Sequence, residues 1–244
     1  MMKTTTPIFL ALRAGPTDVL GVSAKGKSLA IIMMAATAVS SQAALYTDDF
    51  SSGSVTNQVN GYIGGWFGSN FNFQQWYGGV GYAVITGGNL RVSSDSAYRS
   101  AVILFDPTSL EGAGRYRITV DVSSYTGDVN DRGLARVWSG EGYDLSGSSG
   151  NGISVSCEAG TFTASGSATV SDLGSFEITG AGNHEFEFTY DGIGAVGIFL
   201  GAETGGYPFP QLDYNSISVA AIPEPSCAML GCFALSAMLL RRRR

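Results

Sequence analysis

Charged residues, histidine and cysteine are scarce in this chain. Only 14% of its 244 residues are charged, one is histidine and three are cysteine. Helix bundles and coiled coils are rich in Glu, Lys, Ala and Leu, so this composition argues against both classes. One histidine and three cysteines without metal-binding spacing leave no zinc-site motif and no histidine-based catalytic motif.

Glycine and apolar residues are abundant instead. The chain has 34 glycines and is 44% hydrophobic, enough to bury a core, which argues against disorder. Polar and apolar residues alternate in 115–122 and 184–190, as in strands with one wet face. The continuous apolar runs 101–105 and 196–200 predict strands buried on both faces. Further strands are expected at 82–86, 89–92, 135–138, 152–157, 161–164, 168–171 and 212–219.

Short strands separated by Gly-, Asn- and Asp-rich turns predict an all-β fold, an antiparallel β-sandwich or jelly roll. We see no internal repeat, which argues against a propeller or solenoid. The fold is expected to span residues 44–221, flanked by an N-terminal signal helix and a C-terminal hydrophobic helix.

The N-terminal segment 1–43 has the order of a leader and signal peptide. Lys25 and Lys27 precede the apolar run 29–39, and Ser41 and Ala43 supply the small residues that a signal peptidase reads. We expect cleavage after Ala43 and export of the remainder.

The C-terminal segment 222–244 has three parts in a fixed order. Pro223, Glu224 and Pro225 keep the backbone extended, and an apolar run follows at 227–240. That run rises only about 22 Å as a helix, against about 30 Å of hydrocarbon, so it makes a poor permanent anchor. The terminal basic residues favour a cytoplasmic end. They are Arg241, Arg242, Arg243 and Arg244.

This Pro-Glu-Pro, apolar helix and arginine cluster resembles the PEP-CTERM sorting signal of Gram-negative bacteria. The resemblance implies recognition by an exosortase-type transpeptidase after transient anchoring in the inner membrane. It also implies delivery to the cell surface or to an extracellular polysaccharide matrix. An ordinary C-terminal tail anchor is the alternative.

Between the two signals the chain is strongly acidic. Residues 44–222 contain 18 Asp and Glu against 6 Arg and no Lys, for a formal net charge of −12. Such a surface repels phosphates, so nucleic acid is excluded as a partner. The segments 46–50 and 212–219 resemble the first and last strands of carbohydrate-binding-type jelly rolls, which implies that the two ends of the domain pair or lie close together.

Aromatic residues crowd a glycine- and asparagine-rich segment at 62–82. Flat rings beside Asn and Gln amides can stack on sugars and bind their hydroxyls, which favours a glycan-binding role. Core packing beneath a long covering loop explains the same residues. The residues expected to contact a glycan are Trp66, Trp76 and Tyr77.

Calcium is the one cofactor that the sequence suggests. Asp128, Asn130 and Asp131 place three oxygen donors in one loop, and hard oxygen ligands suit calcium. The acidic residues near the domain ends, Asp48, Asp49 and Asp213, could approach one another in a jelly roll. Asx turns explain the same residues without a metal.

Catalytic motifs are weak, and we expect a non-catalytic structural or glycan-interacting module. His184 begins a strand instead of lying beside a nucleophile. Glu185 and Glu187 form the one adjacent carboxylate pair to weigh for acid–base chemistry, as in a polysaccharide lyase or hydrolase. A solvated strand face is the favoured interpretation of that pair, and a buried strand position that of Cys157.

Overall fold

The computed structural model describes residues 44–58, 62–63, 73–79, 81–95, 98–128, 131–142, 150–205 and 209–223. Every regular element in these ranges is a strand, and none of their residues belongs to a helix long and apolar enough to cross a membrane. Both expected terminal helices lie outside the described residues. The strands are β1 (Tyr46–Asp48), β2 (Thr56–Gln58), β3 (Tyr62–Ile63), β4 (Trp76–Gly79), β5 (Ala83–Thr86), β6 (Asn89–Ser93), β7 (Arg99–Phe105), β8 (Gly114–Thr126), β9 (Arg132–Glu141), β10 (Gly152–Ser156), β11 (Thr161–Ser165), β12 (Thr169–Ile178), β13 (Gly182–Tyr190), β14 (Ala195–Glu203) and β15 (Gln211–Ile222).

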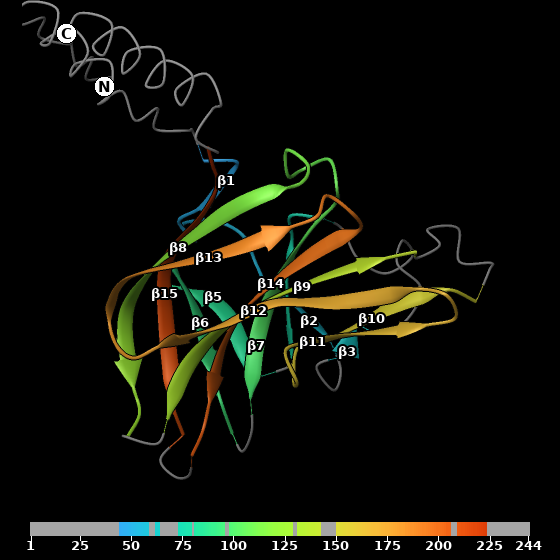
Figure 1. Cartoon of the computed structure of the whole chain (residues 1–244). Helices are drawn as coiled ribbons and strands as arrows, with labels where there is room; N and C mark the ends of the chain where they lie inside the picture. Colours follow the sequence, from blue (N-terminus) through green and yellow to red (C-terminus); the bar gives the residue numbers. More distant parts are fainter. Residues whose placement is uncertain are drawn as a thin grey trace, which may run out of the picture. The chain divides into compact units, whose positions relative to one another are not determined.

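The strands form three sheets (Figure 1). Sheet A has the order β13-β8-β15-β6-β5, with β1 added to β15, and sheet B has the order β12-β9-β14-β7-β4-β2. Sheet C is smaller, with the order β11-β10-β3. The described pairs are antiparallel except β2 with β4, which run parallel. The all-β sandwich is therefore confirmed, with this one departure from the expected antiparallel pairing.

Sheets A and B enclose the first core. The alternating residues of β8, including Ile118 and Val120, pack with Ile198 and Leu200 of β14, and all four are fully buried. Their pattern follows from the two-residue period of a strand, which sends every second side chain to the same face.

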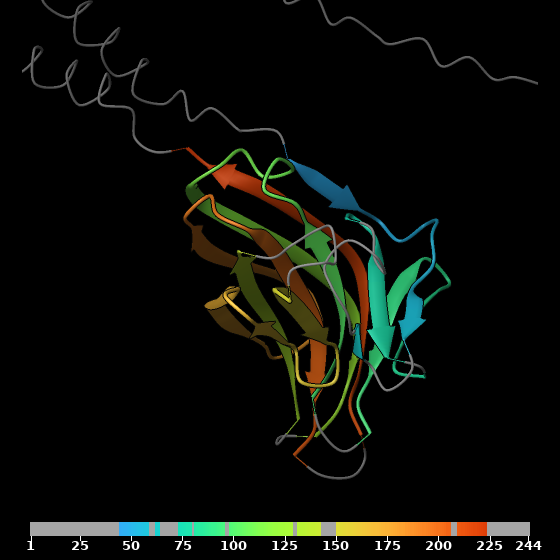
Figure 2. The same ribbon diagram turned by 90° about the vertical axis from the view of Figure 1, so that its right-hand side faces the viewer.

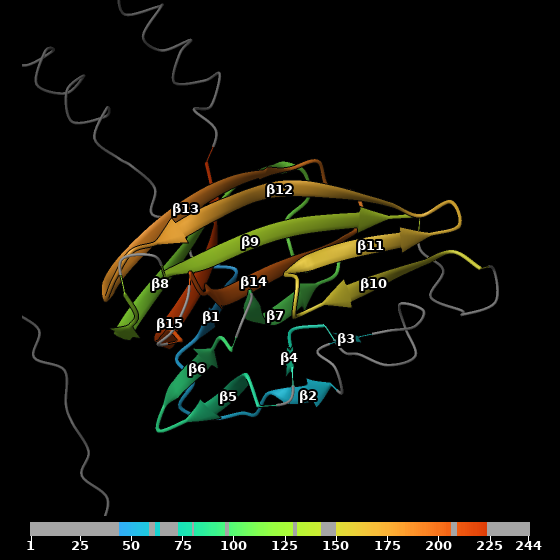
Figure 3. The ribbon, with the colours of Figure 1, turned by 90° about the horizontal axis from the view of Figure 1, so that it is seen from below.

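A second core lies between sheets B and C. Val102 and Phe199 from sheet B pack with Ile153 and Phe162 from sheet C. Sheet B is thus covered on both faces, which confirms the two-sided burial predicted for 101–105 and 196–200. Figure 3 shows β11 beside β9, with β10 on the other side of β11.

Glycine makes room for sheet C on this face of sheet B. A Cβ atom at Gly197 would lie 2.5 Å from a ring atom of Phe162. A larger residue at this position would therefore push Phe162 and sheet C away from sheet B.

The two ends of the described domain pair with each other. Tyr46 of β1 lies opposite Val219 of β15, and the Leu45 amide donates to the Val219 carbonyl at 2.8 Å. Figure 2 shows β1 running beside β15. The resemblance to jelly rolls implied that these ends pair or lie close together, and the structure shows that they pair.

Several strands differ from expectation. β2, β3 and β4 lie in or beside the aromatic segment that was expected to be a glycan-binding loop. β12 continues seven residues beyond the predicted end at Ser171, to Ile178, and a bulge between Asp172 and Gly174 interrupts its pairing with β9. The bulge bends β12 where it forms one edge of sheet B.

Candidate functional site

The aromatic residues predicted to contact a glycan are core residues where the structure describes them. Trp76 is 3% exposed and Tyr77 is 2% exposed. They lie on opposite faces of β4, so Trp76 enters the first core and Tyr77 the second. The prediction that they present rings to a sugar is therefore corrected, because sheets A and C cover both faces of this strand. Trp66 lies outside the described residues.

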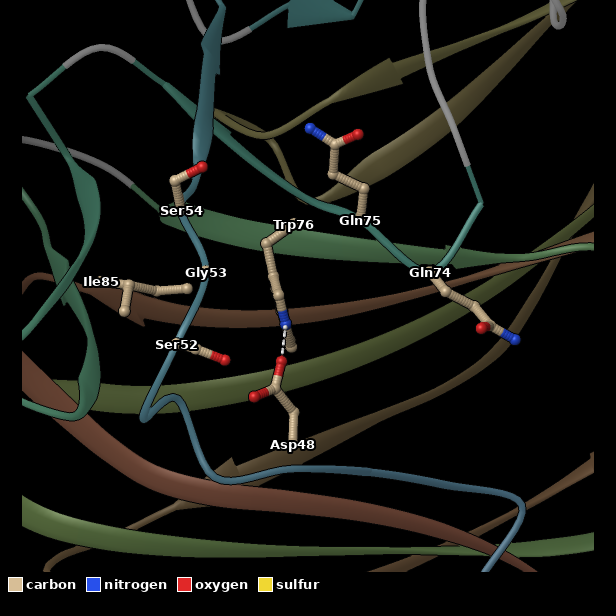
Figure 4. A pocket seen from close by; sticks show the side chains of 8 residues that line it. All are labelled: Asp48, Ser52, Gly53, Ser54, Gln74, Gln75, Trp76 and Ile85. Atoms are coloured by element: carbon tan, nitrogen blue, oxygen red, sulfur yellow. Dashed lines mark hydrogen bonds between the residues drawn. The ribbon is translucent and has the colours of Figure 1, made fainter.

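Trp76 is instead held by a carboxylate from the other sheet, as Figure 4 shows. Its indole N–H donates to Asp48 Oδ2 at 3.0 Å. Asp48 also accepts the Tyr46 hydroxyl at 3.0 Å and the Phe50 amide at 2.8 Å. Burial, together with the charge of Asp48, raises the pKa of Tyr46 well above its ordinary value. Asp48 thus serves three donors from within the protein.

A small pocket surrounds this carboxylate–indole pair. Its volume is about 240 Å³, below the roughly 300–1,000 Å³ typical of ligand sites. In Figure 4 the side chains of Gln74 and Gln75 point away from the Asp48–Trp76 hydrogen bond. The lining residues are Asp48, Ser52, Gly53, Ser54, Gln74, Gln75, Trp76 and Ile85.

Backbone strain lies next to this pocket. Phe50 and Gln74 have φ angles of 52° and 59°, a region that residues other than glycine adopt at a cost of about 1 kcal/mol or more. Phe50 is 1% exposed and contacts the Trp76 ring edge-on at 5.6 Å. Burial and the Asp48 hydrogen bond hold Phe50 in this conformation. We therefore interpret the pocket as a clamp between β1 and β4.

A larger hollow lies between the edge strands of the two main sheets, β13 of sheet A and β12 of sheet B. Its volume is about 530 Å³, within the range of ligand sites. We call it the edge groove, and its lining residues are Arg115, Asp172, Leu173, Glu187, Phe188 and Thr189.

An ion-pair network borders the edge groove. Glu187 accepts from Arg115 Nη2 at 2.6 Å and from Arg117 Nη2 at 2.9 Å, and Glu185 lies 3.7 Å from Arg117 Nε. The hydrogen bond from Arg117, reinforced by Arg115, lowers the pKa of Glu187. Glu187 is therefore ionised at neutral pH and is unsuited to act as a general acid. The favoured interpretation of these two glutamates as part of a solvated strand face fits the structure, which adds ion pairs that the sequence did not predict.

The predicted calcium loop is held by hydrogen bonds within the protein. Asp131 accepts the Asp128 amide at 2.8 Å, the Gly205 amide at 2.9 Å and the Thr204 hydroxyl at 3.1 Å. Burial alone would raise the pKa of Asp131, but these hydrogen bonds outweigh it and lower the pKa. Both oxygens of Asp131 thus face protein donors, and Asn130 lies outside the described residues.

The other acidic residues considered for calcium are not gathered into one site. Asp213 forms an ion pair with Arg91 at 2.8 Å, whereas Asp48 binds Trp76. Within the ranges that the structure describes, no three His, Cys, Asp or Glu side chains form a group that could hold a metal ion. Asx-type hydrogen bonds occur at Asp48 and Asp49, which accept the amides of Phe50 and Ser51, whereas Asp131 and Asp213 are held by other contacts.

His184 and Cys157 are held by contacts that stabilise the fold. A ring nitrogen of His184 lies 2.8 Å from the Gly180 carbonyl at the start of β13, and the ring stacks on Phe186. Cys157 is 1% exposed in the second core, and burial raises the pKa of its thiol to about 12. These positions agree with the structural interpretation of both residues.

Of the residues assigned to processing, the structure describes Pro223, which is exposed and follows β15 directly. The others lie outside the described residues. They are Ser41, Ala43, Glu224, Pro225, Arg241, Arg242, Arg243 and Arg244.

Sequence reasoning missed the edge groove. Arg115 and Thr189 were placed on wet faces of predicted strands, but Asp172 lay beyond the predicted end of its strand. β12 and β13 follow each other in the chain but belong to different main sheets, and Arg115 comes from β8, which pairs with β13. No local pattern in the sequence signals that placement.

No known protein-family model matches the chain, and no curated protein matches it. Several solved structures align with much of the chain at low similarity. The CBM22-1 xylan-binding domain of Xyn10C from Paenibacillus barcinonensis is 10% identical, with a TM-score of 0.39 over 77% of this chain and 99% of that one. The family 29 carbohydrate binding module CBM29_1 from Piromyces equi is 12% identical, with a TM-score of 0.32 over 74% and 91%. The catalytic domain of an endo-1,3-beta-glucanase from Thermotoga petrophila is 11% identical, with a TM-score of 0.34 over 76% and 100%.

Proposed function

We propose that this chain is an exported, non-catalytic module that is processed at both ends and interacts with a glycan at the cell surface or in the extracellular matrix. A signal peptidase would remove 1–43, and an exosortase-type transpeptidase would act at Pro223, Glu224 and Pro225. We further propose that the sandwich is a jelly roll of the carbohydrate-binding type.

The observation that carries this proposal is the pairing of β1 with β15. The first pair of β1, Tyr46 with Val219, lies two residues after the described chain begins, and Ile222 pairs with Arg115 one residue before Pro223. Both expected cleavage regions therefore lie beyond the outermost described pairs of the sheet. Removal of residues 1–43 and of the segment after Pro223 would leave every described strand in place.

The charge distribution supports a neutral glycan as the ligand. Five of the six arginines in the domain pair with carboxylates, and Arg136 donates to the Ala159 carbonyl at 2.7 Å. The remaining acidic side chains leave a surface that repels anionic polymers. A neutral polysaccharide meets no such repulsion.

Two measurements test the proposal. The intact mass of the product from cells that express the full chain reports both processing events. Affinity electrophoresis in gels containing laminarin, arabinoxylan or hydroxyethylcellulose reports binding, with alginate as the anionic control.

We expect a product trimmed at both ends and retarded by at least one neutral polymer. An untrimmed product would overturn the sorting proposal, and unchanged mobility in all neutral gels would overturn the glycan proposal. Release of reducing sugar that Glu187→Gln abolishes would favour a hydrolase instead.

A further inference from the structure

The edge groove has the size and lining of a binding site, and nothing so far assigns it a ligand. Its apolar floor is Leu173, which is partly buried and packs against the first core, whereas Phe188 is 4% exposed and lies in the core beneath it. Its rim is polar, with Arg115, Asp172 and Thr189 from three different strands. An apolar floor below planar polar groups fits a sugar ring, which has apolar C–H faces and a rim of hydroxyls.

The rim offers both donors and acceptors. Arg115 uses Nη2 to bind Glu187, and its side chain is 57% exposed, so the guanidinium, which has five N–H donors, is accessible to a ligand. Asp172 uses Oδ1 to accept the Gly174 amide at 2.9 Å, which leaves Oδ2 without a partner among the described residues. The Thr189 hydroxyl adds a group that both donates and accepts.

The same network argues for a neutral ligand. Glu187 is already bound by both Arg115 and Arg117, so its negative charge is compensated within the protein. The hydroxyl of a neutral ligand can therefore bind beside this network without supplying a charge of its own. An anionic ligand would instead compete with Glu187 for Arg115 and approach Asp172 at close range, which disfavours it.

The groove is less suited to an added peptide strand. β13 pairs regularly with β8 along nine residues, so its free edge is straight. The facing edge of β12 carries the bulge between Asp172 and Gly174, and such bulges obstruct edge-to-edge pairing. A straight strand could follow one wall of the groove but not both.

We propose that the edge groove binds a segment of a neutral polysaccharide, with Arg115, Asp172 and Thr189 contacting its hydroxyls over the apolar side chain of Leu173. This inference rests on the proposed glycan-binding function and names the site for it. The ligand class is an uncharged, hydroxyl-rich chain. The surrounding domain is acidic, and the charge of Glu187 in the groove is already compensated by Arg115 and Arg117.

The test compares two arginines that have similar ion pairs. Arg115→Gln removes a groove donor, whereas Arg132→Gln breaks the exposed pair with Glu203, 2.7 Å long and formed between β9 and β14. Both changes affect exposed pairs, which contribute little to folding, so both variants should keep the wild-type melting temperature. Asp172→Asn retains the acceptor for the Gly174 amide and removes the charge.

The first step identifies which of laminarin, arabinoxylan and hydroxyethylcellulose retards the wild-type protein. The dissociation constant for that polymer is then measured for each variant. We expect about a tenfold weaker affinity for Arg115→Gln, a smaller loss for Asp172→Asn, and no change for Arg132→Gln. Equal affinities for Arg115→Gln and wild type would overturn the groove assignment while the glycan function stands. Wild-type protein that binds none of the three polymers would overturn both. Self-association that Arg115→Gln abolishes, without glycan retention, would indicate a strand-pairing partner and overturn the assignment.

Discussion

Asp48 and Trp76 join the two main sheets through one partly buried hydrogen bond. Asp48 ends β1 of sheet A, Trp76 begins β4 of sheet B, and the indole nitrogen lies 3.0 Å from the carboxylate oxygen. The contact connects residues 28 positions apart, close to the expected start of the mature chain. It therefore ties the first strand of the domain to the opposite side of its core.

Asp48→Ala should destabilise the fold by about 3 kcal/mol, because it leaves the buried Trp76 N–H and the Tyr46 hydroxyl without their acceptor. Asp49→Ala is the matched control, since Asp49 accepts only from Ser51 at the surface, and it should cost less than about 0.5 kcal/mol. Equilibrium unfolding in urea measures both. Equal stability losses in the two variants would show that the Asp48 clamp is energetically unimportant.

Gln74→Gly should be at least as stable as the wild-type protein. Gln74 has a φ of 59°, and glycine adopts this conformation without the steric penalty of a Cβ atom. The change also removes the exposed hydrogen bond of 3.2 Å to Ser109, which contributes little. Gln74→Ala loses the same bond but keeps the strain, so it should be about 1 kcal/mol less stable than Gln74→Gly. Urea unfolding measures the difference, and the reverse order of stability would contradict the strain argument.

The buried loop carboxylate of Asp131 should make stability depend on acid pH. Its pKa in the folded state lies below the ordinary value of 3.8, so the ionised form binds its three donors and stabilises the fold. That contribution is present above the ordinary pKa and is lost as the pH falls through the lowered pKa. Wild type should therefore exceed Asp131→Asn in stability at pH 6, and the difference should shrink as the pH is lowered through this range. Thermal unfolding across pH measures it, and a constant difference would contradict this assignment.

The same protein gives a metal test. Because the described oxygens of Asp131 already accept protein donors, EDTA should leave the melting temperature unchanged at neutral pH. A fall in melting temperature that calcium restores would show that the loop holds calcium in solution.

Cys157 should resist thiol reagents in the native state. It is 1% exposed, and burial raises its pKa to about 12, so little of the reactive thiolate is present at pH 8. Labelling with a chromogenic disulfide should therefore be slow in buffer and fast in denaturant. Rapid labelling of the folded protein would show that sheet C opens readily from sheet B.

The alternation of polar and apolar residues was sufficient to predict many of the strands, but not how the three sheets stack on one another. In β8 and β13 one face is wet, so alternation is visible in the sequence and both strands were predicted. In β4 the adjacent Trp76 and Tyr77 are both buried, because sheet C covers the face that Tyr77 occupies. That coverage depends on residues about 75 positions later, so the pair was interpreted as a binding surface.

The groove shows the same limit. Glu187 was singled out as a member of a carboxylate pair, but its environment depends on Arg115 and Arg117 of another strand, 70 or more positions earlier. The pairing of β13 with β8 determines the charge state of Glu187. Sequence spacing within one strand carries no information on that partner.

The limits of the folded domain predict where processing can occur without loss of stability. A protein beginning at residue 44 and ending at residue 223 keeps the outermost pairs, Tyr46 with Val219 and Arg115 with Ile222, so it should melt at the same temperature as the product made from the full chain. Beginning at residue 49 removes β1 and the Asp48 clamp. We expect a loss of about 3 kcal/mol, which lowers the melting temperature by about 10 °C.

Circular dichroism melting of the two truncated proteins, together with the intact mass of the cellular product, checks this prediction. A cellular product that begins beyond Asp48 and melts like the 44–223 protein would contradict it. In that case the domain would be equally stable with residues 217–219 of β15 unpaired on the side where β1 lies. The pairing of the two ends would then not determine the boundary of the domain.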